Sequence, residues 1–181
     1  MKINHLLKCK RSLAQYSHDW WHMDSVDEKF MTLAIEQASL AFQKGEVPVG
    51  AVITLGGEIL AMSHNSPISI NDPSAHAEIL AIREAARRLD NYRLIDTTLY
   101  VTLEPCIMCA GAIVQARIKR VVFGAEDPKS GGVVSLYRLL HDKRLNHTVE
   151  VTGGVEKDAC AEILGRFFHE KRITSRTESK S

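Results

Sequence analysis

Two short stretches constrain this 181-residue chain more than any other feature of it. One is His76-Ala-Glu78, and the other is Pro105-Cys106-x-x-Cys109. Zinc prefers histidine nitrogen and cysteine thiolate as ligands, and a site with three protein ligands keeps the fourth tetrahedral position open for water. Together the two stretches supply one histidine and two cysteines. The sequence therefore predicts a catalytic zinc site.

The spacing of the three ligands fits two helix starts. Cys106 and Cys109 are three positions apart, so on a helix their sulfur atoms lie on one face and can bind one ion. At the N-terminus of that helix, the macrodipole favours the thiolate form that a metal requires. His76 is predicted in the first turn of another helix. Two helix starts that face each other would bring the three ligands together.

Glu78 is predicted to move protons rather than to bind the metal. It lies two residues from His76, and side chains two apart on a helix diverge. A carboxylate beside the metal can instead take a proton from the bound water and pass protons to a ring nitrogen and a leaving amine. Zinc lowers the pKa of its water towards ~7, which supplies hydroxide at neutral pH. The predicted chemistry is hydrolytic deamination of an amino-substituted heterocycle.

A redox pair or a structural zinc site is the alternative for Cys106 and Cys109. A structural site needs a fourth ligand, and Cys9 and Cys160 are the available candidates. Cys9 lies in a basic N-terminal extension, whereas Cys160 fits the apolar face of the last predicted helix, where a free cysteine behaves as a small hydrophobe. The catalytic interpretation is favoured because each motif has the strand-helix context that it requires.

Composition predicts a single globular domain and limits the partners. The chain is long enough to bury a core, and its 45% hydrophobic and 25% charged residues are typical of globular proteins. The net charge of +1 does not indicate a general affinity for nucleic acid, so an RNA site must be a local patch. No apolar run approaches the ~20 residues of a membrane helix, and no secretory signal is recognised, which predicts a cytoplasmic protein without a membrane partner.

The chain divides into three parts. Residues 1–24 form a basic extension, for which we consider two origins: a disordered segment, or a gene-model artefact with translation starting at Met23. Residues 25–172 form the domain that carries the zinc motifs, and residues 173–181 form a polar, frayed tail. Helices are predicted at residues 26–44, 75–89, 106–116, 134–141 and 156–171, and strands at residues 47–53, 58–63, 98–103, 119–124 and 149–152.

This order of elements predicts an α/β fold in which a mixed five-stranded sheet has helices on both faces. Ser74 is the predicted N-cap of the helix at residues 75–89, so His76 and Glu78 would lie in its first turn. Pro105 is predicted at the first position of the next helix, where its missing N–H is tolerated.

Stretches around the zinc motifs closely resemble the bacterial tRNA-specific adenosine deaminases. They are residues 46–50, 71–79, 91–95, 99–112, 121–124 and 145–147. The resemblance extends from residue 26 to residue 172. These flanking motifs in combination are specific within a superfamily that also includes deaminases of cytidine, deoxycytidylate, guanine and riboflavin precursors.

The resemblance implies an enzyme that converts adenosine to inosine at wobble position 34 of a tRNA anticodon, with zinc-bound hydroxide attacking C6. It also implies a three-layer α/β/α sandwich of the cytidine deaminase-like type, a homodimer, and one Zn²⁺ per subunit. The partner would be the tRNA anticodon stem-loop. By the same resemblance, His76, Cys106 and Cys109 match the zinc ligands and Glu78 matches the proton shuttle.

Four further residues match substrate-binding positions of the family. They are Asn65, Asp127, Lys129 and Phe168. Asn65 resembles a residue that contacts the flipped nucleotide, and its alternative is an ordinary turn-forming asparagine. Asp127 and Lys129 resemble residues beside the RNA backbone, or they are solvated loop charges. Phe168 resembles an aromatic residue near the flipped base, or it extends the core stripe of the last helix.

The last helix carries basic residues near its end, and two valines follow residue 131. Arg166, Lys171 and Arg172 suit phosphate contacts to a single-stranded anticodon loop, and equally suit a helix C-terminus. Val133 and Val134 stand where the family commonly has small residues, which affects the expected conformation of the loop at residues 126–132.

Two other functions compete with tRNA deamination. A deaminase of a free nucleobase or nucleoside, of the guanine or cytidine type, needs no extended basic surface, so the weak net charge permits it. A non-catalytic RNA-binding partner subunit belongs to a different class. Eukaryotic relatives of the family include a partner that lacks the shuttle glutamate, whereas Glu78 is present in this chain.

Overall fold

The computed structural model describes the backbone of residues 19–178 and the side chains of residues 26–174. Residues 1–18, with Cys9, lie outside the described residues, so the two origins weighed for the N-terminal extension stay a prediction. Within the described part, no helix is long and apolar enough to cross a membrane.

A mixed sheet of five strands forms the centre of the molecule, as predicted. The strands are β1 (Gly50–Leu55), β2 (Glu58–His64), β3 (Thr97–Leu103), β4 (Arg120–Ala125) and β5 (Glu150–Gly153). Their order is β2-β1-β3-β4-β5. β1 is antiparallel to both β2 and β3, whereas β3, β4 and β5 run parallel. Because β3 and β4 are parallel, their carboxyl ends lie at the same edge of the sheet.

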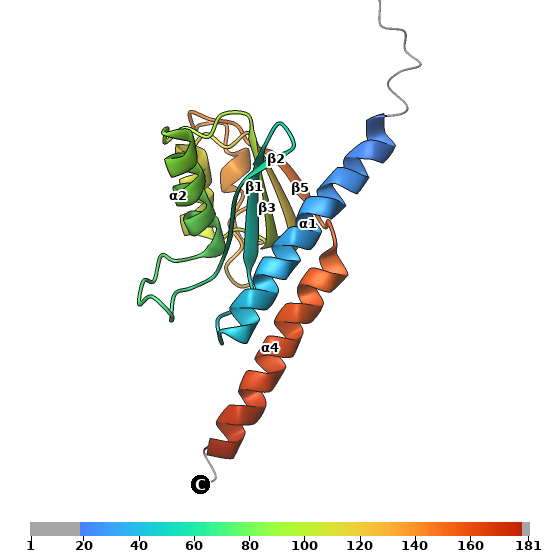
Figure 1. Cartoon of the computed structure of the whole chain (residues 1–181), viewed down its shortest axis with the longest axis vertical. Helices are drawn as coiled ribbons and strands as arrows, with labels where there is room; N and C mark the ends of the chain where they lie inside the picture. Colours follow the sequence, from blue (N-terminus) through green and yellow to red (C-terminus); the bar gives the residue numbers. More distant parts are fainter. Residues whose placement is uncertain (1–18, 179–181) are drawn as a thin grey trace, which may run out of the picture.

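Helices cover both faces of this sheet, which confirms the predicted three-layer α/β/α arrangement. α1 (Asp19–Gln43) and α4 (Lys157–Glu178) lie on one face, and α2 (Ala77–Leu89) and α3 (Ile107–Gln115) lie on the other (Figure 1). Gly50 allows α1 to approach closely, since a Cβ at this position would lie 2.0 Å from the carbonyl oxygen of Ala34. Phe42 of α1 and Phe167 of α4 make an edge-to-face contact with ring centroids 5.7 Å apart.

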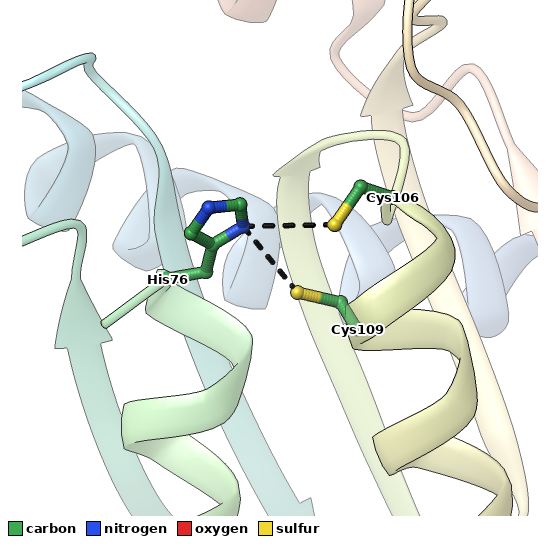
Figure 2. A group of neighbouring side chains, drawn as sticks. All are labelled: His76, Cys106 and Cys109. Atoms are coloured by element: carbon green, nitrogen blue, oxygen red, sulfur yellow. Dashed lines mark hydrogen bonds between the residues drawn. The ribbon is translucent and has the colours of Figure 1, made fainter. Parts of the chain in front are cut away.

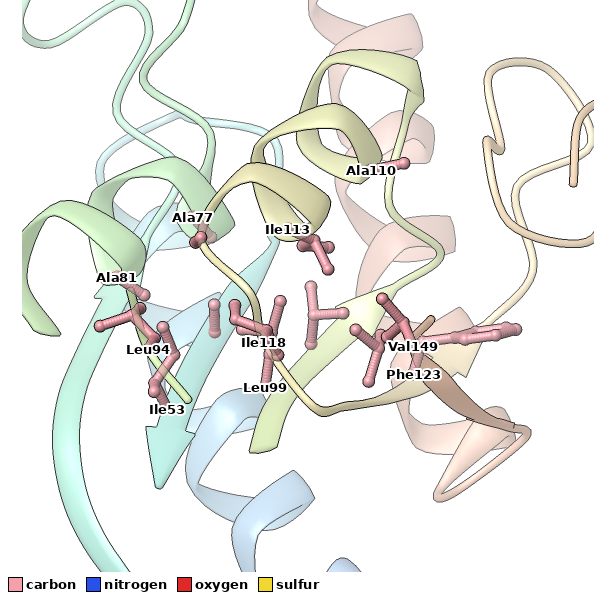
Figure 3. Packing of buried hydrophobic residues seen from close by; sticks show 14 of the residues in the cluster. Ile53, Ala77, Ala81, Leu94, Leu99, Ala110, Ile113, Ile118, Phe123 and Val149 are labelled. Carbon is pink, nitrogen blue, oxygen red and sulfur yellow. The ribbon is translucent and has the colours of Figure 1, made fainter. Parts of the chain in front are cut away.

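Side chains alternate between the two faces of the sheet along each strand, and this divides the core into two layers. Val52 and Tyr100 point toward α1 and α4, whereas their neighbours Ile53 and Leu99 point toward α2 and α3. The second layer is the larger, and Figure 3 shows its residues from the sheet and from both helices packed together. This layer fixes α2 and α3 on the sheet, so the positions of their N-terminal ends are set by the core.

The two helix starts near the zinc motifs differ slightly from the prediction. Ser74 is not the N-cap of α2, because His76 occupies that position and the Ser74 hydroxyl donates to Asp72 Oδ1 at 2.6 Å. Cys106 is the N-cap of α3, so Pro105 precedes the helix instead of opening it. Neither His76 nor Cys106 caps its helix with its side chain, which leaves both side chains available for a metal.

Two long helices extend further than predicted. α1 begins at Asp19 instead of residue 26, and α4 continues to Glu178 instead of ending at residue 171. The predicted boundaries followed the apolar periodicity, which ends where these helices leave the sheet (Figure 1). The frayed tail predicted from residue 173 is therefore helical through Glu178, and residues 179–181 lie outside the described part.

The α-helix predicted at residues 134–141 is wrong, and only a short 3-10 helix, η2 (Leu139–His141), forms there. The backbone N–H groups of Val133, Val134 and Ser135 all donate to one carboxylate oxygen of Glu104, at 3.0, 2.7 and 3.0 Å. The chain makes a single turn around this carboxylate. Beyond the turn, Leu136 and Tyr137 are half exposed. A short helix needs a continuous buried apolar face for stability, and within residues 134–141 only the adjacent Leu139 and Leu140 pack against the core.

Candidate active site

The three predicted metal ligands meet where α2 and α3 begin, beside the carboxyl end of β3. Figure 2 shows His76 at the start of α2 pointing toward both cysteines at the start of α3. Cys106 is half buried, and Cys109, in the first turn of α3, is fully buried. Both helices direct their N-terminal ends toward this corner, so their macrodipoles favour anionic ligands there.

The distances fit a tetrahedral zinc ion. His76 Nδ1 lies 3.5 Å from Cys109 Sγ and 3.7 Å from Cys106 Sγ, and the three ligand atoms lie within 4.8 Å of one another. Zinc bonds of about 2.0 Å to nitrogen and about 2.3 Å to sulfur place such atoms about 3.6 Å apart in a tetrahedral site. In the described part of the chain, these residues are the one His/Cys/Asp/Glu group that could hold a metal ion.

Electrostatics at this corner support metal binding. Hydrogen bonding from Cys109, and then from His76, lowers the pKa of the Cys106 thiol to about 4, so one thiolate is available at neutral pH. The same hydrogen bond, together with burial, raises the pKa of the Cys109 thiol, so the two cysteines share this one thiolate. Cys160, the alternative fourth ligand, packs against Gly124 in the core layer on the opposite face of the sheet. It cannot complete a structural site, so the ligand set has one histidine and two cysteines among the described residues.

Glu78 lies in the first turn of α2 and is almost completely buried, with 3% of its surface exposed. Burial raises the pKa of its carboxyl to about 6, against the opposing effect of His76. A carboxyl group with a pKa in this range can both accept and return a proton near neutral pH. The structure thus places this carboxyl group in the same cleft as the metal ligands, and its role as a proton carrier stays a prediction.

A cleft of about 630 Å³ opens above this corner. Its lining includes the predicted site residues other than the buried Cys109, namely Asn65, His76, Glu78, Cys106, Asp127, Lys129 and Phe168. Residues far apart in the sequence therefore share one cavity. A cleft of this size accommodates a nucleoside-sized group.

Asn65 supports the cleft in a way that the sequence did not reveal. Its side chain is buried, and its Oδ1 accepts the backbone N–H of Ala77 at 2.8 Å. Asn65 thus satisfies the first N–H of α2, which is the task that the sequence assigned to Ser74. Because His76 and Glu78 flank Ala77, Asn65 fixes the helix start that presents both of them. A contact between Asn65 and a nucleotide stays a prediction.

The remaining predicted substrate residues lie around the opening. Asp127 Oδ1 accepts the N–H groups of Lys129 and Ser130, at 2.9 and 3.2 Å, so Asp127 shapes its own loop while Lys129 is exposed. Phe168 is 45% exposed, whereas its neighbour Phe167 is buried. The core stripe of α4 therefore uses Phe167, and Phe168 faces the cleft.

The basic residues of α4 lie in different surroundings. Arg172 lines the cleft, whereas Arg166 and Lys171 lie over the rings of Phe42 and Phe167, with 5.6 and 5.4 Å to the ring centroids. These two cations therefore have intramolecular contacts, which supports the structural alternative for them.

The two valines that depart from the family pattern lie in different environments. Val133 is fully buried in the core beneath the loop, and Val134 is 37% exposed. Both donate their backbone N–H groups to Glu104. The segment is therefore held both by these backbone hydrogen bonds and by the packing of the Val133 side chain in the core.

Sequence reasoning missed two buried carboxylates that line the cleft, Glu46 and Glu104, which are 1% and 2% exposed. A glutamate is almost never fully buried unless it is paired or fully hydrogen-bonded, so each needs dedicated partners. Glu46 Oε1 accepts the N–H and the hydroxyl of Ser69, at 2.6 and 2.8 Å. A glutamate directly after an apolar strand is the signal that identifies Glu104 in the sequence.

Comparison with known proteins identifies the family of the chain. Residues 25–172 match the MafB19-like deaminase family. The tRNA-specific adenosine deaminase of Haemophilus influenzae is 48% identical over 153 residues, covering 84% of this chain and 88% of the relative. That of Bacillus subtilis is 48% identical over 155 residues, covering 86% of this chain and 96% of the relative.

A solved structure from studies of tRNA:A34 deaminases, which edit A to I at the wobble position, superimposes with a TM-score of 0.73. It shares 46% sequence identity, and the match covers 75% of this chain and 99% of that chain. The fold and the site thus define a deaminase of the cytidine deaminase-like class. Within this class, the chain belongs to the family of tRNA-specific adenosine deaminases.

Proposed function

We propose that this protein deaminates adenosine to inosine at wobble position 34 of a tRNA anticodon, in the cytoplasm. The observation that carries the proposal is the convergence of the metal ligands and the buried Glu78 on the floor of one cleft. The substrate follows from the relatives, which are tRNA-specific adenosine deaminases at 48% identity over most of both chains.

His76, Cys106 and Cys109 would hold one Zn²⁺ per subunit, which supplies a Lewis acid that activates water at neutral pH. Glu78 accepts a proton from the attacking water and delivers it to N1 of the adenine ring. A C–O bond forms at C6, the C6–N6 bond breaks, and a further proton carried by Glu78 allows the amine to leave as ammonia. The pKa of about 6 for Glu78 suits a group that carries protons in both directions.

The rim of the cleft would hold the single-stranded anticodon loop. RNA loops are bound through unstacked bases on aromatic side chains together with contacts to the phosphates. Phe168 offers an exposed ring at the cleft, and Lys129 and Arg172 offer cations. Asn65 and Asp127 provide polar atoms that line the same cavity. These groups surround the position above Glu78 where a flipped base would enter.

A homodimer is part of the proposal, and the outer face of α3 supports it. Ile107 and Met108 are 48% and 39% exposed there, and the small residues Gly111 and Ala112 continue the same face. A helix that is apolar on every side is normally buried. A second copy of the chain would cover this face. Met108→Glu is expected to convert the dimer to a monomer in light scattering, and a wild-type protein that is monomeric would contradict the proposal.

The decisive experiment measures inosine. The zinc-loaded protein is incubated with an anticodon stem-loop that carries adenosine at position 34, and with a matched stem-loop that carries guanosine there. Inosine is expected only in the first RNA. Free guanine, cytidine and adenosine are tested in parallel. Turnover of a free compound without inosine in the RNA would favour a free-nucleobase or nucleoside deaminase instead. Zinc and RNA binding without any turnover would favour a non-catalytic partner subunit.

A further inference from the structure

The loop at residues 126–135 is built around a single buried carboxylate. One oxygen of Glu104 accepts the N–H groups of Val133, Val134 and Ser135, at 3.0, 2.7 and 3.0 Å. The other oxygen accepts the N–H of Asp127 at 3.0 Å and the hydroxyl of Ser135. All five donors belong to the same loop. In the described part of the chain, no cation pairs with Glu104.

Such a carboxylate is stabilised by dipoles alone. Successive N–H groups of the backbone form a concave nest that binds an anion, and here the anion is a side chain of the same protein. A buried carboxylate that lacks its donors is strongly destabilised, and donors that lose the carboxylate are left unpaired. Glu104 and the loop therefore hold each other in one arrangement.

The loop packs closely against the Glu104 carboxyl group and against the backbone of Cys106. A Cβ at Gly131 would lie 2.4 Å from the Glu104 carboxyl group, and a Cβ at Gly132 would lie 2.9 Å from the backbone of Cys106. The N–H of Gly132 donates to the carbonyl of Pro105 at 2.8 Å. The loop thus packs directly on the backbone of the metal ligand. At its other end it carries Asp127 to the cleft.

We propose that Glu104 is a positioning residue, which fixes the loop at residues 126–135 against the start of α3 and thereby sets the affinity for the RNA substrate. This inference rests on the proposed function. Glu104 transfers no proton in the reaction, because both of its oxygens are occupied by the loop. A loop whose contact groups are held in place before binding loses less conformational entropy when RNA binds. Loss of the anchor therefore raises KM and leaves the chemical step unchanged.

Glu104→Gln tests the anchor with an isosteric change. The amide oxygen is expected on the side of Val133, Val134 and Ser135, because an NH2 group there would face three donors. The NH2 group then takes the other position, where the Ser135 hydroxyl can rotate to accept but the N–H of Asp127 cannot. The variant thus releases the Asp127 end of the loop and keeps the other end.

Amide hydrogen exchange provides a readout that requires no substrate. In the zinc-loaded Glu104→Gln variant, the N–H of Asp127 is expected to exchange at least about tenfold faster, while Val133 and Val134 keep their protection. Glu46→Gln is the matched control, since Glu46 is an equally buried glutamate of the cleft that binds Ile68 and Ser69 instead. It should leave the exchange of Asp127 unchanged. Unchanged exchange at Asp127 in the Glu104→Gln variant would overturn the anchoring role.

Kinetic measurements on the anticodon stem-loop test whether the anchored loop sets the affinity for RNA. For Glu104→Gln, KM is expected to rise by about tenfold, with kcat at saturation within about twofold of wild type and one zinc per chain retained. A loss of zinc, or a lower kcat with unchanged KM, would show that Glu104 supports the metal corner instead. If the wild-type protein makes no inosine, the proposed function fails, whereas the exchange experiment still decides whether Glu104 anchors the loop.

Ser135→Ala keeps the inference testable if Glu104→Gln does not fold. This change removes one of the five donors and leaves the backbone contacts of Glu104 in place. The KM is expected to rise in the same direction by about two- to threefold, because one hydrogen bond to a charged group is lost. An unchanged KM together with unchanged exchange at Asp127 would contradict the proposal.

Discussion

The floor and the rim of the cleft are built in different ways. The floor consists of His76, Glu78, Cys106 and Cys109. These residues lie within the first turns of α2 and α3, which the core holds on the sheet. The rim consists of Phe168 of α4 and of the loops at residues 66–70 and 126–135, which have no regular secondary structure. Each loop is fixed from below by one buried carboxylate, Glu46 or Glu104.

Because of this difference, substitutions in the floor and in the rim are expected to have different effects. The floor contains the groups that bind the metal and move protons, so a change there alters the chemical step. The rim contains the groups that would contact RNA, and its geometry depends on a few hydrogen bonds instead of a packed core. A change in the rim is therefore expected to alter KM, or the stability of a loop, while the floor keeps its metal.

Removal of a metal ligand is expected to have the largest effect. Cys109→Ala leaves one thiolate and one imidazole, so zinc content should fall well below one per chain and inosine formation should be lost. Cys160→Ala is the matched control, because Cys160 is also a fully buried cysteine but lies on the opposite face of the sheet. Metal analysis and a stem-loop assay compare the two. Equal loss of zinc in both variants would contradict the assignment of the ligands.

Glu78→Gln is expected to lower kcat by about 10²- to 10⁴-fold, because the amide cannot carry protons. Zinc content and RNA affinity should stay at the wild-type level, since Glu78 is not one of the three ligands. Glu126→Gln serves as the control, since Glu126 is a cleft carboxylate that is exposed and paired with Lys157 at 3.3 Å. Single-turnover rates on the stem-loop measure the effect. A Glu78→Gln variant with normal turnover would remove Glu78 from the mechanism.

The floor could be predicted from the sequence because its information is local. Two positions separate His76 from Glu78, and three separate Cys106 from Cys109, so helix periodicity alone relates their side chains. The mixed five-stranded sheet with helices on both faces followed from the order of the predicted elements, whereas the strand order was not predicted. At the floor, the two helix starts were misplaced. For α2 the reason is that Asn65, a residue distant in the sequence, accepts the N–H group expected to be capped by Ser74.

The rim could not be predicted because its contacts are not local. Glu104 binds donors that lie 23 to 31 residues further along the chain, and Glu46 binds Ser69 across 23 residues. No periodic pattern links such positions. The apolar residues at 134–141 indicated a helix, but Leu136 and Tyr137 are half exposed and the chain instead makes one turn around the Glu104 carboxylate. The local apolar pattern did not reveal this distant partner.

Phe168→Ala tests the rim through an aromatic side chain. Loss of a stacked base, worth about 1–3 kcal/mol, should raise KM for the stem-loop by about tenfold with little change in kcat. Phe168→Tyr keeps the ring and should restore a KM close to that of wild type. Because Phe168 is 45% exposed, neither change should lower the melting temperature much. A large loss of stability without a change in KM would place Phe168 in the core instead of the rim.

The smallest expected effect concerns the pH dependence of the loop held by Glu46. Burial acts to raise the pKa of Glu46, but hydrogen bonds from Ser69 and Ile68 outweigh it and hold this pKa below its ordinary value of 4.5. A depressed pKa means that the carboxylate stabilises the folded state above pH 4.5, and that this stabilisation is lost as the pH falls through the lower, folded-state pKa. Nearby His64 adds to the lowering.

Glu46→Gln should therefore be less stable than wild type at pH 6, by about 1–2 kcal/mol for a charge-assisted hydrogen bond. The difference should shrink as the pH falls from 4.5 through the lower, folded-state pKa, because the unfolded chain takes up its proton before folded Glu46 becomes neutral. Melting temperatures of both proteins between pH 6 and pH 3 measure this. A difference that stays constant over this range would mean that the shape of the side chain, and not its charge, holds the rim at residues 66–70.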